Sequence, residues 1–374
     1  MTISIWEKET VLAPQDVLII GAGVMGLWTA LELKQLQPNL RILVLDRGAI
    51  PTGASYRNAG FACFGSPTEL WSDAATMGED AMLHIVEQRI KGIEKVRKHF
   101  TDQEIDFDAC GGYECFTKTD TTLVDRIAAL NATMQSVTGN TNTFRIANEQ
   151  LKQLGLSNFN ALVSSAWEGG IHSGKYLQAL HKRAIVAGIQ VVHGSALLHW
   201  QETNDQVVAE TSLGYIHTKQ LLLCTNGFLQ ELITDTETVP ARGQVLVTSP
   251  IDGLALRGTF HFDEGFYYWR NLGNRILLGG ARNVNKAAEQ TTALHTTPEI
   301  QSALEAFLHK HIGAQYSYSI EQRWSGIMGF TKDKRPQFTQ HSARVRSAIA
   351  CNGMGVALAP MMAETVATVV LQNS

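Results

Sequence analysis

The clearest chemical signature in the chain is a set of three glycines, Gly21, Gly23 and Gly26. They form a GxGxxG pattern, Gly21-Ala22-Gly23-Val24-Met25-Gly26, between the apolar run 16–20 and a segment with helical spacing. The first glycine permits a tight turn, the second lets the backbone approach a pyrophosphate, and the third lets helix and strand pack closely. Because a helix N-terminus offers free N–H groups and a partial positive charge, the pattern predicts a dinucleotide site.

Asp46 is the second residue with a predicted role at this site, because it ends the next apolar run, 41–45. A carboxylate at this position accepts hydrogen bonds from ribose hydroxyls. It also repels a 2′-phosphate, so NADP is disfavoured.

Two further features favour FAD over NAD. The chain has no second GxGxxG, so no separate nicotinamide domain is indicated. In addition, Asn352-Gly353-Met354-Gly355 precedes the last predicted helix, whose N-terminus could face the N1–C2=O edge of an isoalloxazine ring. That edge becomes negative on reduction, so a helix dipole there favours hydride acceptance. A plain strand-to-helix turn is the alternative interpretation of these glycines.

The elements around these motifs alternate between helices and strands. We expect helices at 21–35, 79–100, 123–136, 174–188 and 298–310, with a final helix after residue 355. We expect strands at 16–20, 41–45, 111–117, 189–193, 206–211, 215–217, 220–224 and 347–351, and a hairpin at 271–274 between 266–270 and 275–278. The sequence contains no internal repeat and no low-complexity linker that would mark a single boundary between two domains. We therefore expect the chain to pass repeatedly between the two domains.

Composition supports a compact enzyme. The chain has 374 residues, of which 44% are hydrophobic and 18% charged, which excludes a disordered protein. The net charge of −4 and the lack of a basic run argue against nucleic-acid binding. The five cysteines, Cys63, Cys110, Cys115, Cys224 and Cys351, include no CxxC pair, so we expect no metal site and a reducing compartment.

The two ends of the chain bear on its location. Residues 1–9 lack the apolar core of a signal peptide. The apolar stretch 355–371 is interrupted by Pro360 and Glu364 and is shorter than the ~20 residues that a membrane span needs. We therefore expect a buried helix, no membrane span and a cytoplasmic protein.

Together these segments resemble the D-amino-acid-oxidase-like (DAO) family of FAD-dependent amine oxidoreductases, the group of glycine oxidase, sarcosine oxidase and D-amino-acid dehydrogenase. The resemblance extends from residue 17 to residue 371. It implies an α/β fold with a GR2-type, Rossmann-like FAD-binding domain at 14–85, 160–228 and 330–374. It also implies a second, α+β substrate domain built on an antiparallel sheet, at 86–159 and 229–329.

The resemblance also assigns residues to the cofactor. In the family the loop Pro51-Thr-Gly-Ala-Ser-Tyr-Arg-Asn-Ala-Gly-Phe61 wraps the FAD pyrophosphate and ribityl chain and reaches the flavin ring. Arg57 suits phosphate neutralisation, and Gly60 allows close approach. The full set of expected cofactor contacts is Gly21, Ala22, Gly23, Val24, Met25, Gly26, Asp46, Arg47, Ser55, Arg57, Asn58, Ala59, Gly60, Phe61, Ala196, Leu197, Thr225, Asn226, Gly227, Gly353, Met354, Gly355 and Val356.

The implied reaction is hydride transfer from the α-carbon of a small amine or amino acid to flavin N5, giving an imine that hydrolyses. The cofactor carries this chemistry, so the lack of an evident acid–base constellation does not argue against an enzyme. No cysteine matches the family's covalent attachment site, since 326–328 occupies that region, and we expect non-covalent FAD. The electron acceptor, O2 or a quinone or another acceptor, and the oligomeric state stay open.

The sequence gives less evidence for the part of the site that would bind the substrate. Tyr267 matches a carboxylate-binding tyrosine of glycine oxidase, and Trp269 shares its strand face, so both are expected in the pocket, with Tyr268 and Arg270 facing away. Met328 stands where those relatives place a carboxylate-pairing arginine. Either another cation serves, with Arg282 and Arg57 as candidates, or the substrate is an amine without that carboxylate.

Other interpretations stay open from the sequence. His172 and His261 could be bases, but a lone histidine is more often structural. An oxidase of a modified tRNA side chain would share this fold, although the acidic net charge argues against it. A non-catalytic flavoprotein would be consistent with the missing arginine.

Overall fold

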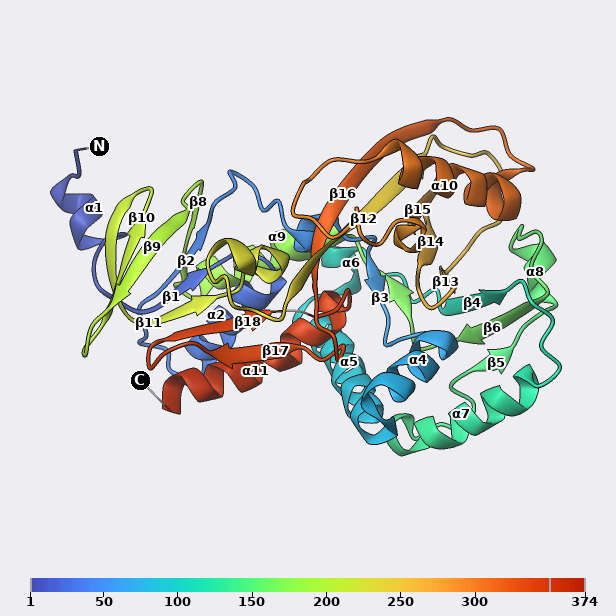
Figure 1. Cartoon of the computed structure of the whole chain (residues 1–374), viewed down its shortest axis with the longest axis horizontal. Helices are drawn as coiled ribbons and strands as arrows, with labels where there is room; N and C mark the ends of the chain where they lie inside the picture. Colours follow the sequence, from blue (N-terminus) through green and yellow to red (C-terminus); the bar gives the residue numbers. More distant parts are fainter. Residues whose placement is uncertain (1, 350, 373–374) are drawn as a thin grey trace.

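The computed structural model describes residues 2–349 and 351–372. Figure 1 shows two lobes that lie side by side, with both termini in the lobe that contains the glycine motif. Each lobe is built on one eight-stranded sheet, and a third sheet of two short strands lies between them. The chain passes repeatedly from one lobe to the other.

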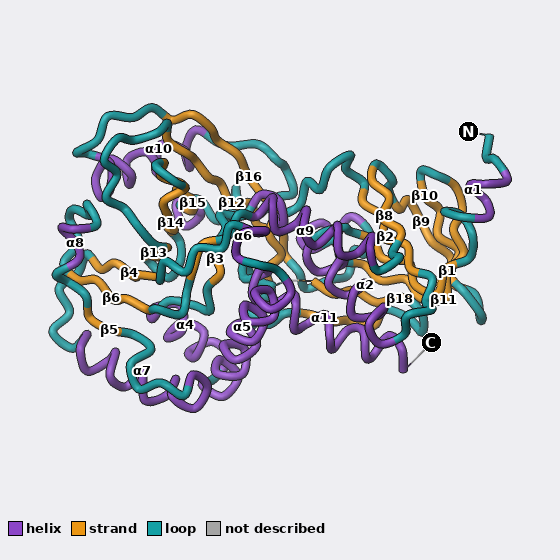
Figure 2. The backbone as a smooth tube through the Cα atoms, turned by 180° about the vertical axis from the view of Figure 1, so that it is seen from behind, coloured by secondary structure: helices purple, strands orange, loops and turns teal. Residues whose placement is uncertain are grey.

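The first lobe contains a mainly parallel sheet in the order β17-β18-β11-β1-β2-β8. Its strands are β1 (Gln15–Ile20), β2 (Ile42–Asp46), β8 (Gln190–His193), β11 (Gly214–Leu223), β17 (Gln337–Gln340) and β18 (Val345–Ile349), with β9 (Leu197–Glu202) and β10 (Val207–Thr211) joined to β11. Figure 2 shows α2 (Val24–Leu36), α9 (Ser173–Val186) and α11 (Gly355–Gln372) together on one face of this sheet.

The burial of β1 follows from its apolar sequence. Because successive strand residues point to opposite faces, Val17 and Ile19 pack under the helices, whereas Leu18 and Ile20 pack on the side of β9 and β10. A parallel strand covered on both faces needs apolar residues at every position, and these four supply them. The strand therefore holds the glycine motif that follows it in a fixed place.

The second lobe contains a mainly antiparallel sheet in the order β16-β12-β15-β14-β13-β4-β6-β5. Its strands are β4 (Gly112–Phe116), β5 (Arg145–Ile146), β6 (Ala161–Ser165), β12 (Val239–Thr248), β13 (Thr259–Phe262), β14 (Tyr267–Leu272), β15 (Arg275–Gly280) and β16 (Ile320–Phe330). The remaining elements are α1 (Ile5–Glu9), α3 (Ala54–Arg57), β3 (Phe61–Ala62), α4 (Pro67–Met77), α5 (Glu79–His99), α6 (Asp102–Ile105), α7 (Leu123–Thr138), α8 (Gln150–Gln153), β7 (Gly169–Gly170), η1 (Asn226–Glu231), η2 (Arg282–Val284), α10 (Pro298–Leu308) and η3 (His309–Gly313).

The register of the second sheet decides which side chains face the first lobe. Residues paired across neighbouring strands share a face of the sheet. One such row consists of Val245, Gly279, Tyr268, His261 and Glu114. The adjacent row, with Leu246, Leu278, Trp269 and Phe260, points the opposite way, into the core beneath α10.

Several sequence predictions need correction. Predicted strands 215–217 and 220–224 form one strand, β11. The strand predicted at 347–351 is β18, at Val345–Ile349, and residue 350 lies outside the described residues, as do 373 and 374 of the predicted FAD domain. β6 pairs with β4 in the second sheet, although the boundary at 160 assigned it to the FAD domain. Ile93 and Val96 of α5 pack in the first lobe's core, although they were assigned to the substrate domain.

Helix α11 is the one helix of the described residues with the length and apolar composition of a membrane-crossing segment. In the fold it serves as a core helix, because Ala359, Ala363, Val366 and Ala367 are fully buried in the cluster shared with α2. It also packs closely on α5 at Gly92, where a Cβ atom would overlap the carbonyl oxygen of Ala357. Glycine at this position brings the start of α11 against α5.

Replacing Gly92 with alanine should therefore destabilise the protein. Alanine gains ~1 kcal/mol of helix propensity over glycine. Overpacking typically costs about 1–3 kcal/mol, and the cost should exceed that gain here because the overlapping atom belongs to the backbone and no side-chain rotation relieves it. We expect Gly92→Ala to lower the Tm in thermal unfolding, whereas Glu94→Ala, at an exposed position on the same helix, should not. Equal Tm values for the two variants would contradict this packing.

Candidate functional site

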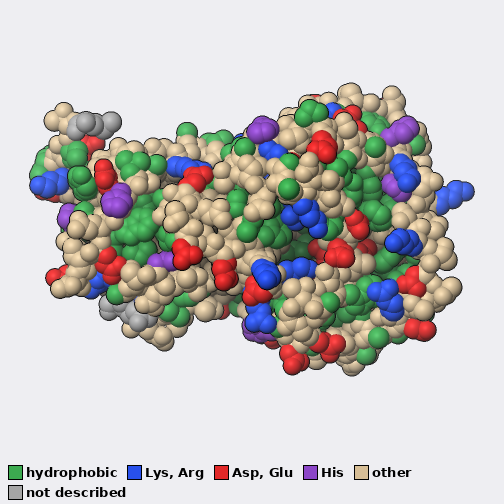
Figure 3. All heavy atoms as spheres, in the orientation of Figure 1, with side chains coloured by type: hydrophobic (Ala, Val, Ile, Leu, Met, Phe, Trp, Pro, Cys, Tyr) green, Lys and Arg blue, Asp and Glu red, His purple; other side chains and the backbone are tan. Residues whose placement is uncertain are grey.

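A large cavity lies between the two lobes, with a volume of about 830 Å³. It extends from the glycine motif after β1, past the loop 51–61, to the turn that precedes α11, and it also reaches β12, β13 and β14 of the second sheet. Figure 3 shows acidic and basic side chains gathered around the junction of the lobes. The volume of the cavity is in the range typical of cofactor and ligand sites.

The glycine motif forms one end of the cavity. A Cβ atom at Gly26 would overlap the carbonyl oxygen of Gly21, so the third glycine is required for the tight turn into α2. Asp46 Oδ2 accepts a hydrogen bond from the Ala22 N–H at 3.0 Å. The Val24 N–H, in the first turn of α2, donates to Ser55 Oγ at 3.0 Å. The helix N-terminus is thus directed at the cavity and at the loop that closes over it.

Asn58 holds that loop in shape. Its amide donates to the carbonyl oxygen of Ser55 at 3.0 Å, and its Oδ1 accepts from the Gly60 N–H at 2.8 Å and from Ser173 Oγ at 2.7 Å. The guanidinium of Arg270 donates to the carbonyl oxygen of Gly60 from behind. The loop is therefore fixed by both lobes.

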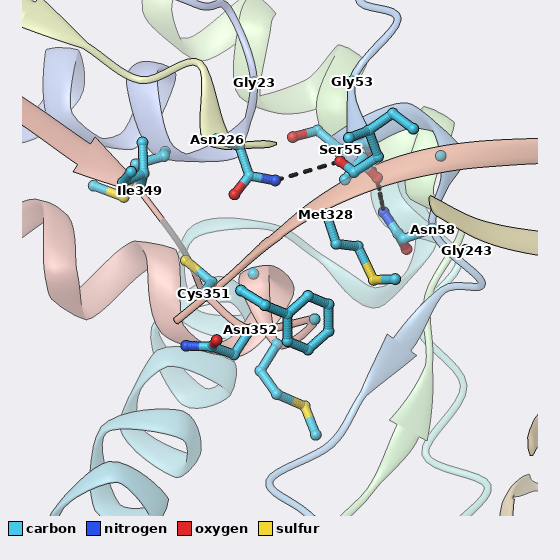
Figure 4. Close-up of a pocket in the computed structure, with 18 of the residues that line it drawn as sticks. Gly23, Gly53, Ser55, Asn58, Asn226, Gly243, Met328, Ile349, Cys351 and Asn352 are labelled. Atoms are coloured by element: carbon cyan, nitrogen blue, oxygen red, sulfur yellow. Dashed lines mark hydrogen bonds between the residues drawn. The ribbon is translucent and has the colours of Figure 1, made fainter. Parts of the chain in front are cut away.

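The other end of the cavity is formed by three segments that are far apart in the sequence. Figure 4 shows Asn226 from η1, Met328 from β16 and Asn352 from the turn before α11 around the same space. Asn352 Oδ1 accepts from the Thr331 N–H at 2.9 Å, and Cys63 Sγ lies 3.6 Å from Met354 Sδ. These contacts connect the turn to β16 and to β3.

The site fits a bound dinucleotide. Thr225 Oγ1 is buried at the cavity wall without a hydrogen-bond partner, and the cradle at Gly21 and Gly26 admits no Cβ atom. An unpaired buried hydroxyl and a backbone cradle at a helix N-terminus are what a phosphate- and hydroxyl-bearing cofactor requires.

Most of the residues expected at the cofactor line the cavity. These are Gly21, Gly23, Val24, Met25, Asp46, Arg47, Ser55, Arg57, Asn58, Ala59, Phe61, Ala196, Leu197, Thr225, Asn226, Gly353, Met354, Gly355 and Val356. Ala22, Gly26, Gly60 and Gly227 are not in the lining and support it from behind. Arg57 lines the cavity, but its guanidinium donates to the Ser325 carbonyl oxygen at 3.0 Å and so is directed at β16.

The prediction that Tyr267 and Trp269 face the pocket is wrong. Trp269 is fully buried in the core under α10, and the ring of Tyr267 stacks on Phe307 with centroids 4.4 Å apart. Tyr268, in the other row, lines the cavity, while Arg270 supports the loop at Gly60. The prediction assigned the two faces of this strand one residue out of phase. The cause is the aromatic cluster with Phe307, a residue that is distant in the sequence and packs on the face of the sheet opposite the cavity.

Arg282 is placed in the cavity wall, as expected of a substrate-binding cation. Its guanidinium lies 4.6 Å from the ring centroid of Phe330 and 5.7 Å from that of Phe266. Burial lowers the pKa of Arg282. The electrostatic interaction with the neighbouring Tyr268 acts in the opposite direction and raises this pKa. Arg282 forms no salt bridge with any residue that the structure describes. A half-buried cation with no ion-pair partner among the described residues favours an anionic ligand.

His261 lines the cavity within a buried ionic cluster. Its Nε2 lies 3.2 Å from Glu168 Oε2, and its Nδ1 lies 3.4 Å from Glu69 Oε2. Although burial disfavours the charge, these carboxylates raise the pKa of His261 to about 9. Burial also raises the pKa of the nearby Glu114 to about 7. His172, by contrast, caps α9 by accepting from the Lys175 N–H at 3.2 Å.

Glu69 was not found from the sequence. The available signal was the segment Ser66-Pro-Thr-Glu69, a capping box that starts α4 and places the carboxylate at the cavity. Cys63, Glu168 and His261 each place one possible metal-ligand atom within 4.8 Å of the others. However, both ring nitrogens of His261 already face carboxylates, and burial raises the pKa of the Cys63 thiol well above its ordinary value. A thiolate ligand is therefore disfavoured there.

Comparison with known proteins extends these observations. The family model described as FAD dependent oxidoreductase (DAO) matches residues 16–369. A probable oxidoreductase OrdL from Haemophilus influenzae is 23% identical, over 95% of this chain and 83% of its own length.

Two solved structures share the fold. L-proline dehydrogenase from P. horikoshii has a TM-score of 0.77 at 17% identity, covering 96% of this chain and 94% of its own. Glycine oxidase from Geobacillus kaustophilus has a TM-score of 0.77 at 18% identity, covering 96% and 95%. Because the family model spans nearly the whole chain and the cavity suits its cofactor, the protein belongs to the DAO family of FAD-dependent oxidoreductases.

Proposed function

We propose that the protein oxidises a small amine that carries a carboxylate, such as an amino acid, and that Arg282 and Tyr268 bind this carboxylate. The observation that carries the proposal is the unpaired, half-buried guanidinium of Arg282 in the cavity wall next to the Tyr268 ring. The fold neighbours named above, a glycine oxidase and a proline dehydrogenase, act on amino acids by their names, which supports this substrate class.

Tyr268 suits the role because of its place in the sheet. The row that faces the cavity has glycine at 279, next to Tyr268, and a Cβ atom at Gly279 would contact the tyrosine ring. Burial raises the pKa of Tyr268 to about 12, so its hydroxyl stays protonated and can donate to an anion. A phenol donor beside a guanidinium makes a site for one carboxylate.

Arg282 also accounts for the methionine at position 328. Met328 lies at the cavity in place of the arginine that relatives use, and its Cε approaches Gly243 on β12. Arg282 follows β15 at the start of η2, so it enters the cavity from a different strand. The cation is thus supplied from another position, and the methionine contributes apolar surface.

The bound FAD supplies the hydride acceptor in this proposal. The protein's residues orient the substrate: Arg282 and Tyr268 hold the carboxylate, while Met328 and Phe61 provide apolar walls that exclude water. No protein acid or base is needed for the hydride step itself. The electron acceptor stays open between O2 and a quinone or another acceptor.

An anaerobic titration tests the substrate class. The holoenzyme should lose its flavin absorbance when a suitable amino acid is added without oxygen, since hydride transfer reduces the flavin. Glycine, sarcosine, L-proline, other amino acids of both configurations and simple amines form the panel. No bleaching with any of them, in a sample that dithionite reduces normally, would remove this proposal.

Substitutions test the residues. Arg282→Met and Tyr268→Phe each remove a hydrogen bond to a charged group, worth about 1.5–3 kcal/mol, so kcat/KM for a bleaching amino acid should fall about tenfold or more. FAD content, read from the ratio of flavin to protein absorbance, should not change. Tyr267→Phe is the matched control, because its ring lies in the core under α10. A larger loss in Tyr267→Phe than in Tyr268→Phe would contradict the assignment.

A further inference from the structure

Glu69 is held at the cavity by its own helix cap. Ser66 caps α4, and Glu69 is the third residue of that helix. Glu69 Oε2 accepts from the Ser66 N–H at 2.9 Å and from Ser66 Oγ at 2.8 Å, and it faces His261 Nδ1 at 3.4 Å. One carboxylate oxygen therefore has three polar partners, and the side chain is fixed in orientation.

The second carboxylate oxygen of Glu69, Oε1, has no polar partner among the described residues. Among the residues that the structure describes, Oε1 accepts no hydrogen bond, yet the carboxylate lines the cavity and the side chain is only 17% exposed. It lies against Gly265, where a Cβ atom would approach Oε1 to 2.6 Å. Glycine at 265, with φ of +75°, leaves the space above this oxygen open.

The carboxylate stays ionised in spite of its burial. Burial raises the pKa of Glu69, but the His261 charge and the hydrogen bonds from Ser66 outweigh it, and the pKa lies below its ordinary value. His261 is in turn paired with Glu168, so its single positive charge is shared between two carboxylates. The cluster therefore has two carboxylates for one imidazolium, and the Glu69 carboxylate is the one that lines the cavity.

This negative group lies beside the proposed carboxylate site. His261 is paired with Tyr268 across β13 and β14, so the Glu69–His261 contact is one strand away from Tyr268 on the same face. The wall of the cavity then includes both a cation, Arg282, and a carboxylate oxygen, Glu69 Oε1, that accepts no hydrogen bond from the described residues. Such a pair matches a ligand with an anionic group and a cationic nitrogen.

We propose that Glu69 Oε1 receives an ammonium group of the substrate and so determines which amines bind. This inference rests on the proposed function, because it takes the cavity as the substrate site. The ammonium has two sources, the reacting nitrogen or a second amino group. A carboxylate beside the reacting nitrogen would hold it protonated, and a protonated amine cannot release hydride. The second amino group of a diamine-type substrate is therefore the source that the chemistry favours.

The experiment measures binding to the oxidised holoenzyme by the flavin difference spectrum, under anaerobic conditions and before any reduction. The probes are 1,4-diaminobutane, butylamine and acetate. The variant is Glu69→Gln, which keeps the shape and an acceptor for Ser66 but removes the charge. The matched control is Glu264→Gln, which removes a different cavity-lining carboxylate.

Glu69→Gln should weaken the binding of 1,4-diaminobutane about tenfold or more and leave the affinity for acetate unchanged, whereas Glu264→Gln should bind both probes like the wild type. A loss for 1,4-diaminobutane that exceeds the loss for butylamine identifies a second amino group, and equal losses identify the reacting nitrogen. Unchanged amine binding in Glu69→Gln, an equal loss in Glu264→Gln, or no amine binding by the wild type overturns the inference.

The two proposals can fail separately. If the wild type binds 1,4-diaminobutane through Glu69 but no amine bleaches the flavin, the proposed oxidation fails and the ammonium site stands. If amino acids bleach the flavin and Glu69→Gln binds amines like the wild type, only the ammonium site fails.

Discussion

The alternation of side chains along the strands of the second sheet is the constraint on which the substrate side of the site depends. Residues at paired positions share one face, so Val245, Tyr268 and His261 all face the cavity once the register is set. The opposite face is committed to the aromatic core beneath α10, with Trp269 and Phe260. A shift of one residue would exchange a polar cavity wall for an apolar one.

The same constraint explains what the sequence could and could not reveal. The glycine motif and Asp46 depend on local backbone chemistry, and their sequence context predicted a dinucleotide site, whereas the family resemblance placed the loop at Asn58 there; all three line one cavity. The phase of β14 is decided by Phe307, which lies on α10 and is distant in sequence. The resemblance assigned Tyr267 to the pocket, and alternation along the strand then assigned Trp269 to the same face, so both were wrong together.

Glu69 shows a second limit of sequence reasoning. Its capping box is a local pattern, and it predicts the start of α4. Its chemical role depends on His261 and Glu168, which come from β13 and from the segment before β7. A carboxylate that looks like an ordinary helix cap becomes a buried, ionised group only through those distant partners. Buried charges of this kind are costly unless paired, so their retention at a cavity points to function.

The two lobes thus contribute different parts of the site. In this proposal the first lobe supplies the backbone cradle and helix N-termini for FAD, and the sheet face of the second lobe supplies Tyr268 beside the Glu69–His261 contact, with Arg282 in the same cavity wall. A crystal structure of the oxidised holoenzyme with bound acetate tests this account most directly. The account predicts the acetate carboxylate on Arg282 and Tyr268, between the sheet and the flavin ring. Acetate bound elsewhere in the cavity, with the Arg282 guanidinium directed away from it, would contradict the account.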